Sequence, residues 1–133
     1  AMKGAVYMTI LVLLWCGMVA LVDMPGDPWK APPEADRLID PLVDDAKAIV
    51  RGQKVFSSLC WTCHGTAGKG DGPAAAGLPI QPANFSDPSV QAQSNGALFW
   101  KITHGRGVMP TYQEALSREE RWAVVHYLRT LSP

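Results

Sequence analysis

The sequence feature that most constrains this chain is the five-residue segment Cys60-Trp61-Thr62-Cys63-His64. Two thiols three positions apart, followed directly by an imidazole, have the spacing that covalent haem attachment requires. Each sulfur can add to one vinyl group of a porphyrin, and the imidazole can then bind the iron. The chain has only three cysteines and three histidines, so this order is hard to obtain by chance. The segment predicts one covalently bound haem c on Cys60 and Cys63, with His64 as an iron ligand.

Two other kinds of site use a similar pair of cysteines. A structural zinc site needs a second pair of Cys or His ligands at suitable spacing, and the sequence has none. A thioredoxin-like dithiol needs alternating strands and helices around it, and that pattern is missing as well. Both alternatives are therefore disfavoured.

The formal net charge of zero conceals three differently charged segments. Residues 1–22 contain one lysine and no acid, residues 23–45 have two basic against seven acidic residues, and residues 46–133 have nine basic against five acidic residues. No basic run with interleaved aromatic residues occurs, so no nucleic-acid partner is expected. We predict an N-terminal transmembrane anchor (1–22), a proline-rich acidic strap (23–45) and a haem domain (46–133).

Residues 5–22 form an apolar stretch without a single charge. As a helix it would be about 27 Å long, close to the hydrocarbon thickness of a bilayer. Lys3 before it and the acidic segment after it orient the N-terminus toward the cytoplasm. A cleaved signal peptide has the same charge order, but no Ala-x-Ala-like site precedes Asp23. A lipid on Cys16 fits poorly because bulky Trp15 precedes it, so an uncleaved anchor with a buried thiol is expected.

The strap contains five of the eleven prolines, which predicts an extended, polyproline-like segment. It also contains more apolar side chains than a solvated linker needs. These are Trp29, Leu38, Ile39, Leu42 and Val43. We expect the strap to pack along a partner subunit or along its own domain.

Apolar residues at three- and four-residue spacing predict helices in the haem domain. One runs from about Asp45 to Leu59, with Asp44 or Asp45 near its N-cap. Its apolar stripe consists of Ile49, Gly52, Val55, Phe56 and Leu59. Glycine on this stripe costs roughly 1 kcal/mol relative to alanine, so another helix is expected to cross closely at Gly52.

That second helix opens at Ser117, which forms a capping-box pattern with Glu120. Its apolar face is formed by Val124, Tyr127, Leu128 and Leu131, which leaves His126 facing solvent. A short helix is expected over residues 95–104, and glycine- and proline-rich loops occupy the rest. No alternating strand pattern exceeds four residues, so the predicted fold class is all-α.

Met109 is the only methionine within residues 46–133. It lies in a glycine-bounded loop before Pro110, about 45 residues after His64. A thioether is a soft, neutral ligand that favours Fe(II), so Met109 is the candidate second iron ligand. The alternatives are a core methionine that fills a gap, or His104 as the ligand. His104 could instead contact a haem propionate or cap its helix.

Together these segments resemble a class I cytochrome c over residues 46–133. The resemblance is carried by Arg51-Gly52 leading to Phe56, the haem motif, Gly70-Asp71-Gly72-Pro73, Met109-Pro110 and the ending from Trp122 to Leu131. It implies the class I cytochrome c fold around one haem, export, and single-electron transfer without a catalytic site. It also implies a proline carbonyl that accepts the Nδ1–H of His64, with Pro73 as candidate and Pro79 as rival. We further expect Trp100 and Arg106 on the propionate side, Trp100 being equally suited to the core.

The order of anchor, strap and haem domain resembles membrane-bound monohaem subunits of respiratory complexes. Among these is the monohaem subunit of alternative complex III, a quinol-oxidising complex. This layout predicts an electron carrier in the cytoplasmic (inner) membrane, with its haem domain on the periplasmic side. The expected partners are other subunits of the complex, a redox protein donor and acceptor, and membrane lipid. Two alternatives stay open, namely a haem-based sensor of small ligands and a structural subunit whose haem only staples the fold.

Overall fold

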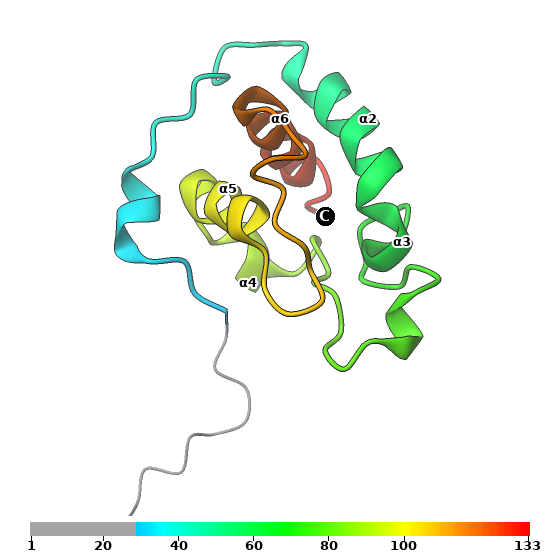
Figure 1. Cartoon of the computed structure of the whole chain (residues 1–133). Helices are drawn as coiled ribbons and strands as arrows, with labels where there is room; N and C mark the ends of the chain where they lie inside the picture. Colours follow the sequence, from blue (N-terminus) through cyan, green and yellow to red (C-terminus); the bar gives the residue numbers. More distant parts are fainter. Residues whose placement is uncertain (1–28) are drawn as a thin grey trace, which may run out of the picture.

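The structure is a computed structural model that describes residues 29–133 as helices joined by long loops (Figure 1). The elements are η1 (Pro33–Arg37), α2 (Ala48–Leu59), α3 (Trp61–His64), η2 (Ala75–Gly77), α4 (Pro88–Gln91), α5 (Asn95–His104) and α6 (Arg118–Arg129). The only β pairing in this part of the chain is an isolated bridge between Arg106 and Met109. The predicted all-α, loop-rich architecture is confirmed for residues 29–133.

The predicted membrane segment falls on residues 1–22, which lie outside the described part of the chain. Among residues 29–133, no helix has both the length and the hydropathy to cross a bilayer. The anchor therefore stays a prediction.

Helices α2 and α6 cross in direct backbone contact at Gly52 (Figure 1). A Cβ atom added to Gly52 would lie 1.9 Å from the carbonyl oxygen of Ala123. Real Cβ atoms never approach an oxygen so closely, so only glycine permits this crossing. The predicted close approach is confirmed, and it explains why α2 contains a residue of poor helix propensity.

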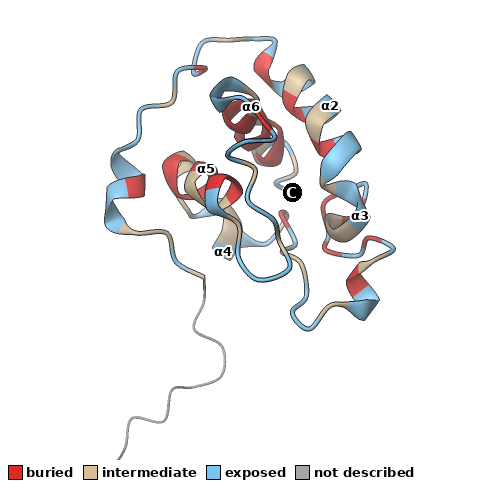
Figure 2. Ribbon diagram, viewed as in Figure 1, coloured by how far each residue is buried: buried red, intermediate tan, exposed pale blue. Residues whose placement is uncertain are grey.

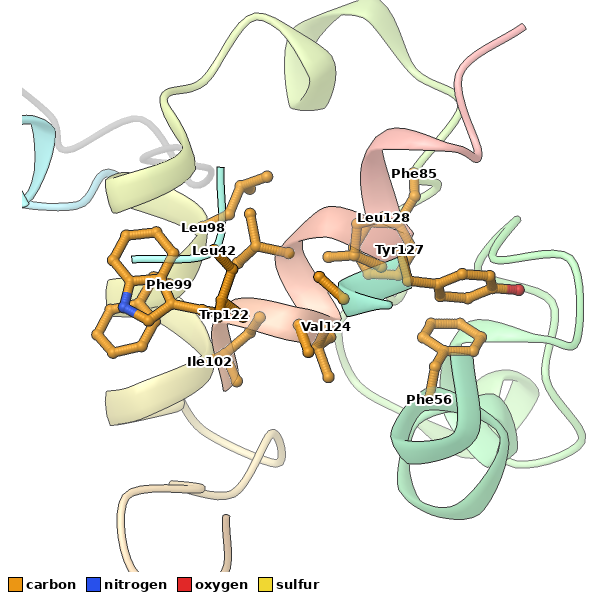
Figure 3. Packing of buried hydrophobic residues seen from close by; sticks show 13 residues of the cluster. Leu42, Phe56, Phe85, Leu98, Phe99, Ile102, Trp122, Val124, Tyr127 and Leu128 are labelled. Carbon is orange, nitrogen blue, oxygen red and sulfur yellow. The ribbon is translucent and has the colours of Figure 1, made fainter. Parts of the chain in front are cut away.

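Aromatic rings fill the core on both sides of α6 (Figure 3). On one side the Phe56 ring of α2 lies 5.2 Å from the Tyr127 ring and 6.0 Å from the Phe85 ring, measured between centroids. On the other side Phe99 of α5 stacks on Trp122 at 4.2 Å. Helix α6 is thus buried on more faces than the single predicted stripe, as its predominantly red ribbon shows (Figure 2).

The predicted start of α2 was wrong. The helix begins at Ala48, and its N-cap residue Lys47 makes no side-chain cap. Asp45 instead accepts a hydrogen bond from the backbone N–H of Lys47 at 2.8 Å and another from Arg51 Nη2 at 2.7 Å. These two bonds hold residues 45–47 in a turn ahead of the helix.

The predicted stripe of α2 was also partly wrong. Its buried residues are Ala48, Gly52 and Phe56, which share one narrow face against α6. Ile49 and Leu59 are 42% and 44% exposed because they lie beside that face. A pattern of apolar spacing does not reveal how narrow the contact with a partner helix is.

The other two helix predictions are confirmed. Helix α5 covers Asn95–His104, and its N-cap Ser94 accepts a hydrogen bond from the N–H of Ala97 at 2.9 Å. Helix α6 begins with the predicted capping box, in which Ser117 and Glu120 exchange two hydrogen bonds of 2.8 and 3.1 Å.

Residues 29–45 of the strap pack against their own domain, with η1 lying beside α5 (Figure 1). Ala35 is buried, and its carbonyl oxygen would lie 1.9 Å from a Cβ atom on Gly96 of α5. Ser94 donates to the Asp36 carboxylate, which ties the strap to the start of α5. Of the two predicted locations, the structure therefore shows packing on the chain's own domain for these residues.

The prediction that His126 faces solvent was wrong. Its side chain is only 18% exposed, and its Nε2 lies 2.9 Å from the Asp40 carboxylate of the strap. Asp40 also accepts a hydrogen bond of 3.2 Å from Asn95. The strap covers this face of α6, which the helical pattern alone could not indicate.

Candidate haem site

The haem motif forms the short helix α3 directly after α2, and the following loop fixes its backbone. The carbonyl groups at the end of a helix have no partner within the helix and need one elsewhere. Three loop N–H groups supply these partners, with Gly70 donating to His64, Gly72 to Cys63 and Ala74 to Thr62 at 2.8–3.0 Å. The loop thereby holds the motif in one orientation.

His64 is oriented by a backbone carbonyl and by an aromatic ring. Its Nδ1 lies 3.1 Å from the carbonyl oxygen of Ala83, and its ring stacks on Phe85 with centroids 4.7 Å apart. Donation from Nδ1–H leaves the lone pair of Nε2 available for a metal. Burial lowers the pKa of His64, although the Ala83 contact opposes this shift. The imidazole is therefore held neutral, which is the form that binds a metal.

The predicted proline acceptor for His64 was wrong. The acceptor is Ala83, whereas Pro73 and Pro79 are exposed. Phe85 donates its N–H to Gly68 at 2.7 Å, and this bond brings the segment around Ala83 alongside the imidazole. Every residue has a backbone carbonyl, so no sequence pattern could have indicated Ala83. Phe85 could have been noticed as the only phenylalanine in the loops of the haem domain.

Cys60 and Cys63 are half-buried free thiols. Burial, followed by the neighbouring Cys63, raises the pKa of the Cys60 thiol to about 11. Before attachment to haem, the Cys60 thiol is therefore protonated at neutral pH. Within residues 29–133 no group of three or more His, Cys, Asp or Glu side chains could hold a metal ion.

Met109 is presented by a tight turn that is fixed to the end of α5. Arg106 and Met109 exchange two backbone hydrogen bonds of 2.9 and 3.0 Å. Beyond the turn, Thr111 Oγ1 donates to the Thr103 carbonyl at 2.6 Å and Tyr112 N donates to the Ile102 carbonyl at 3.2 Å. Met109 is half-buried and packs against the core.

The two thiols, the imidazole and the thioether line one cavity. The lining residues are Leu59, Cys60, Cys63, His64, Leu78, Val108, Met109, Pro110 and Tyr112. Burial raises the pKa of Tyr112, so its hydroxyl is neutral. Leu59 and Val108 leave apolar surface exposed here, which is unusual without a covering group. Apolar walls with two attaching sulfurs, one free imidazole nitrogen and one thioether fit a covalent haem.

Trp100, His104 and Arg106 do not line this cavity. Trp100 and His104 stack on each other, and His104 Nδ1 lies 2.8 Å from the Trp100 carbonyl oxygen of its own helix. Arg106 lies instead over the ring of Trp29. The predicted propionate contacts of Trp100 and Arg106 stay predictions. Leu59, Leu78 and Tyr112 are lining residues that sequence reasoning did not identify.

A helical, loop-rich domain that brings a CxxCH motif and a thioether into one cavity defines the class of c-type haem proteins. The chain belongs to the cytochrome c family, whose family model, described as "Cytochrome c", matches residues 49–132. It therefore carries covalently bound haem c, attached at Cys60 and Cys63.

Several solved structures are similar to this chain, among them the following two. One belongs to the Kuenenia stuttgartiensis reducing HAO-like protein complex Kustc0457/Kustc0458, with 32% identity, a TM-score of 0.61, and coverage of 66% of this chain and 45% of that chain. This chain thus spans less than half of that neighbour's length. The other is the KustC0563 c-type cytochrome, with 30% identity, a TM-score of 0.55, and coverage of 62% of this chain and 98% of that chain. No curated protein matches the chain.

Proposed function

We propose that this chain is a single-electron carrier whose haem iron is held between His64 Nε2 and Met109 Sδ. The observation that carries the proposal is that these two atoms belong to residues lining the same cavity as both attaching thiols. When bound, haem c supplies a one-electron Fe(III)/Fe(II) couple. With His64 and Met109 both bound, the iron would offer no place for a substrate, so the chain would act as a carrier and not as an enzyme.

The protein's own contribution is to bind the haem, to orient the two iron ligands and to line the cavity with apolar side chains. Ala83 and Phe85 fix the imidazole ring of His64, and the turn between Arg106 and Met109 fixes the thioether. Leu59, Leu78 and Val108 contribute apolar side chains to the wall of the cavity that would surround the porphyrin. Apolar surroundings and a thioether ligand would both favour the reduced iron.

The ligand assignment is tested with the variant Met109→Ala of the haem-loaded protein. We expect loss of the weak sulfur-to-iron charge-transfer band in the ferric state and ready CO binding in the ferrous state. Val108→Ala, which changes a neighbouring wall residue and leaves the sulfur, is the matched control and should keep the band. Ready CO binding by the unaltered protein would instead support a ligand sensor with an open iron position.

We propose further that the carrier is a monohaem subunit anchored in the cytoplasmic membrane, with its haem domain on the periplasmic side. The uncharged stretch 5–22, flanked by Lys3 and the acidic strap, supports this setting. Similarity to a chain of a multi-protein redox complex supports other subunits as partners. We propose that the chain is a subunit of a quinol-oxidising complex and exchanges electrons with a redox protein donor and acceptor.

The setting is tested by purification from detergent-solubilised membranes, followed by identification of co-migrating subunits. We expect the haem-staining chain in the membrane fraction, in a complex with quinol-oxidising turnover. Met109→Ala should assemble normally but abolish turnover. Release of the chain into a soluble periplasmic extract would contradict the anchor, and turnover retained by Met109→Ala would show that the haem only staples the fold.

A further inference from the structure

We propose that Trp29 of the strap is a positioning residue for Met109 and acts through Arg106. The inference rests on the proposed ligation of the iron by Met109. It adds a role for the strap, which lies outside the region matched by the family model. Three sets of contacts carry it, taken from the Met109 turn outward.

The first contact set joins Arg106 to Met109. The backbone N–H of Arg106 donates to the Met109 carbonyl, and the N–H of Met109 donates to the Arg106 carbonyl. The two residues are therefore fixed to each other as the two sides of one short turn. A change in the position of Arg106 moves the backbone that presents the thioether.

The second contact places Arg106 against the strap. Its Cζ atom lies 6.0 Å from the centroid of the Trp29 ring, within the range of a cation–π interaction. Within residues 29–133 the guanidinium makes no hydrogen bond and no ion pair. The indole ring is thus the described group that holds this exposed side chain to the rest of the molecule.

The third contact set explains why Trp29 is itself held in place. The Nζ of Lys101 in α5 lies 5.4 Å from the same ring, so the indole interacts with two cations that repel each other. A few residues further along, Ala35 packs on Gly96 and Asp36 accepts from Ser94. Since these contacts fix the strap to α5, the Trp29 ring is a fixed support for the Met109 turn.

The strap therefore connects the predicted membrane anchor with the turn that carries Met109. Six residues separate Trp29 from the predicted anchor, and the Trp29 ring contacts the guanidinium of Arg106, a residue of the turn that carries the proposed sulfur ligand. Contact between the strap and this turn should decide how firmly Met109 stays bound. A strap pulled away by the membrane or by a partner subunit would loosen it.

The experiment is a titration of the ferric, haem-loaded protein with imidazole, which must displace Met109 to bind the iron. An exposed cation–π contact is worth enough to change a binding constant about two- to fivefold. Trp29→Ala should therefore bind imidazole about two- to fivefold more tightly, and Arg106→Gln should do the same. The double variant should show no more than either single change, because both remove one contact. Trp29→Phe keeps an aromatic ring, so its affinity for imidazole should lie between those of the unaltered protein and of Trp29→Ala.

Ile39→Ala is the control, because Ile39 is a strap residue that is 82% exposed and far along the strap from the turn. It should bind imidazole as the unaltered protein does. Unchanged affinity in Trp29→Ala, or effects that multiply in the double variant, would overturn the inference while leaving Met109 as ligand. If imidazole binding by the unaltered protein did not remove the charge-transfer band, the ligand assignment itself would fail.

Discussion

Single residues decide how closely the chain can approach itself at its two tightest contacts. Gly52 lets α6 touch the backbone of α2, and Gly96 lets the strap touch the backbone of α5. In both places the neighbour is a carbonyl group that cannot rotate away as a flexible side chain could. The position of each whole element therefore depends on the absence of one methyl group.

Gly52→Ala should lower the free energy of unfolding by roughly 1–3 kcal/mol, since the new Cβ would overlap the Ala123 carbonyl. Denaturant unfolding of the haem-loaded protein measures the change. Gly77→Ala is the matched control, because nothing lies within 4 Å of the Cβ position there. It should change stability by no more than about 1 kcal/mol. Equal effects of the two substitutions would mean that α2 and α6 are farther apart than described.

Residues whose side chains carry the chemistry could be predicted from the sequence. Cys60, Cys63 and His64 form a motif with one common use, and the cavity brings them together with Met109. Ala83 could not be predicted, because its contribution is a carbonyl group that every residue possesses. What decides its role is the path of the loop, and that path is set by contacts between residues distant in sequence.

At the scale of elements, the start of α2 depends on a charged side chain. A side-chain hydrogen bond from Arg51, then one from the backbone of Lys47, lowers the pKa of Asp45 below its usual value of 3.8. A carboxyl group with a lowered pKa stabilises the folded state above its unfolded pKa. This contribution to stability is lost as the pH falls below 3.8 and through the lower pKa that Asp45 has in the folded state.

Asp45→Asn should therefore destabilise the protein near neutral pH, and the difference from the unaltered protein should shrink as the pH falls below 3.8. Thermal unfolding midpoints measured between pH 6 and pH 3 test this expectation, the upper pH lying well above the usual carboxyl range. Asp44→Asn changes a neighbouring carboxylate that lacks these two contacts, so it is the matched control and should leave the unfolding midpoint close to that of the unaltered protein. A constant difference for Asp45→Asn would contradict the proposed role of the ionised carboxylate.

Where neighbouring residues mark the start of a helix, both the helix and its first residue could be predicted from the sequence. Ser117 and Glu120 mark the start of α6 by reciprocal hydrogen bonds between near neighbours. The start of α2 was not predictable to the residue, because Asp45 serves a turn ahead of the helix instead of capping it. Both uses of an aspartate rely on the same acceptor chemistry, so local sequence does not distinguish them.

At the scale of the whole molecule, the strap adds a layer to one side of the haem domain (Figure 1). Its central polar contact joins Asp40 to His126, two residues 86 positions apart. Proline content predicted an extended segment, which is wrong for Pro33–Arg37 because these residues form the 3-10 helix η1. No local pattern could show which surface the strap covers. For the same reason the burial of His126 could not be anticipated.

Asp40→Ala should release the strap, because His126 and Asn95 lose their shared acceptor. An unpaired buried donor costs about 1–3 kcal/mol, which corresponds to local opening roughly five- to 150-fold more often. Trypsin should then cut after Arg37 faster by a factor in that range, as followed by mass spectrometry. Asp44→Ala is the matched control and should be cut at the original rate. Equal cutting of both variants would show that other contacts hold the strap.

The crossing of α2 and α6 has a consequence for the order of events in biogenesis. Residues 118–129 of α6 follow the two thiols by about sixty positions, so the ribosome synthesises them later. Until then, the face of α2 that contains Phe56 has no partner helix. The crossing at Gly52 can therefore form only after the haem motif has been synthesised, and it leaves both thiols at a cavity that is still open to the porphyrin once α6 has packed.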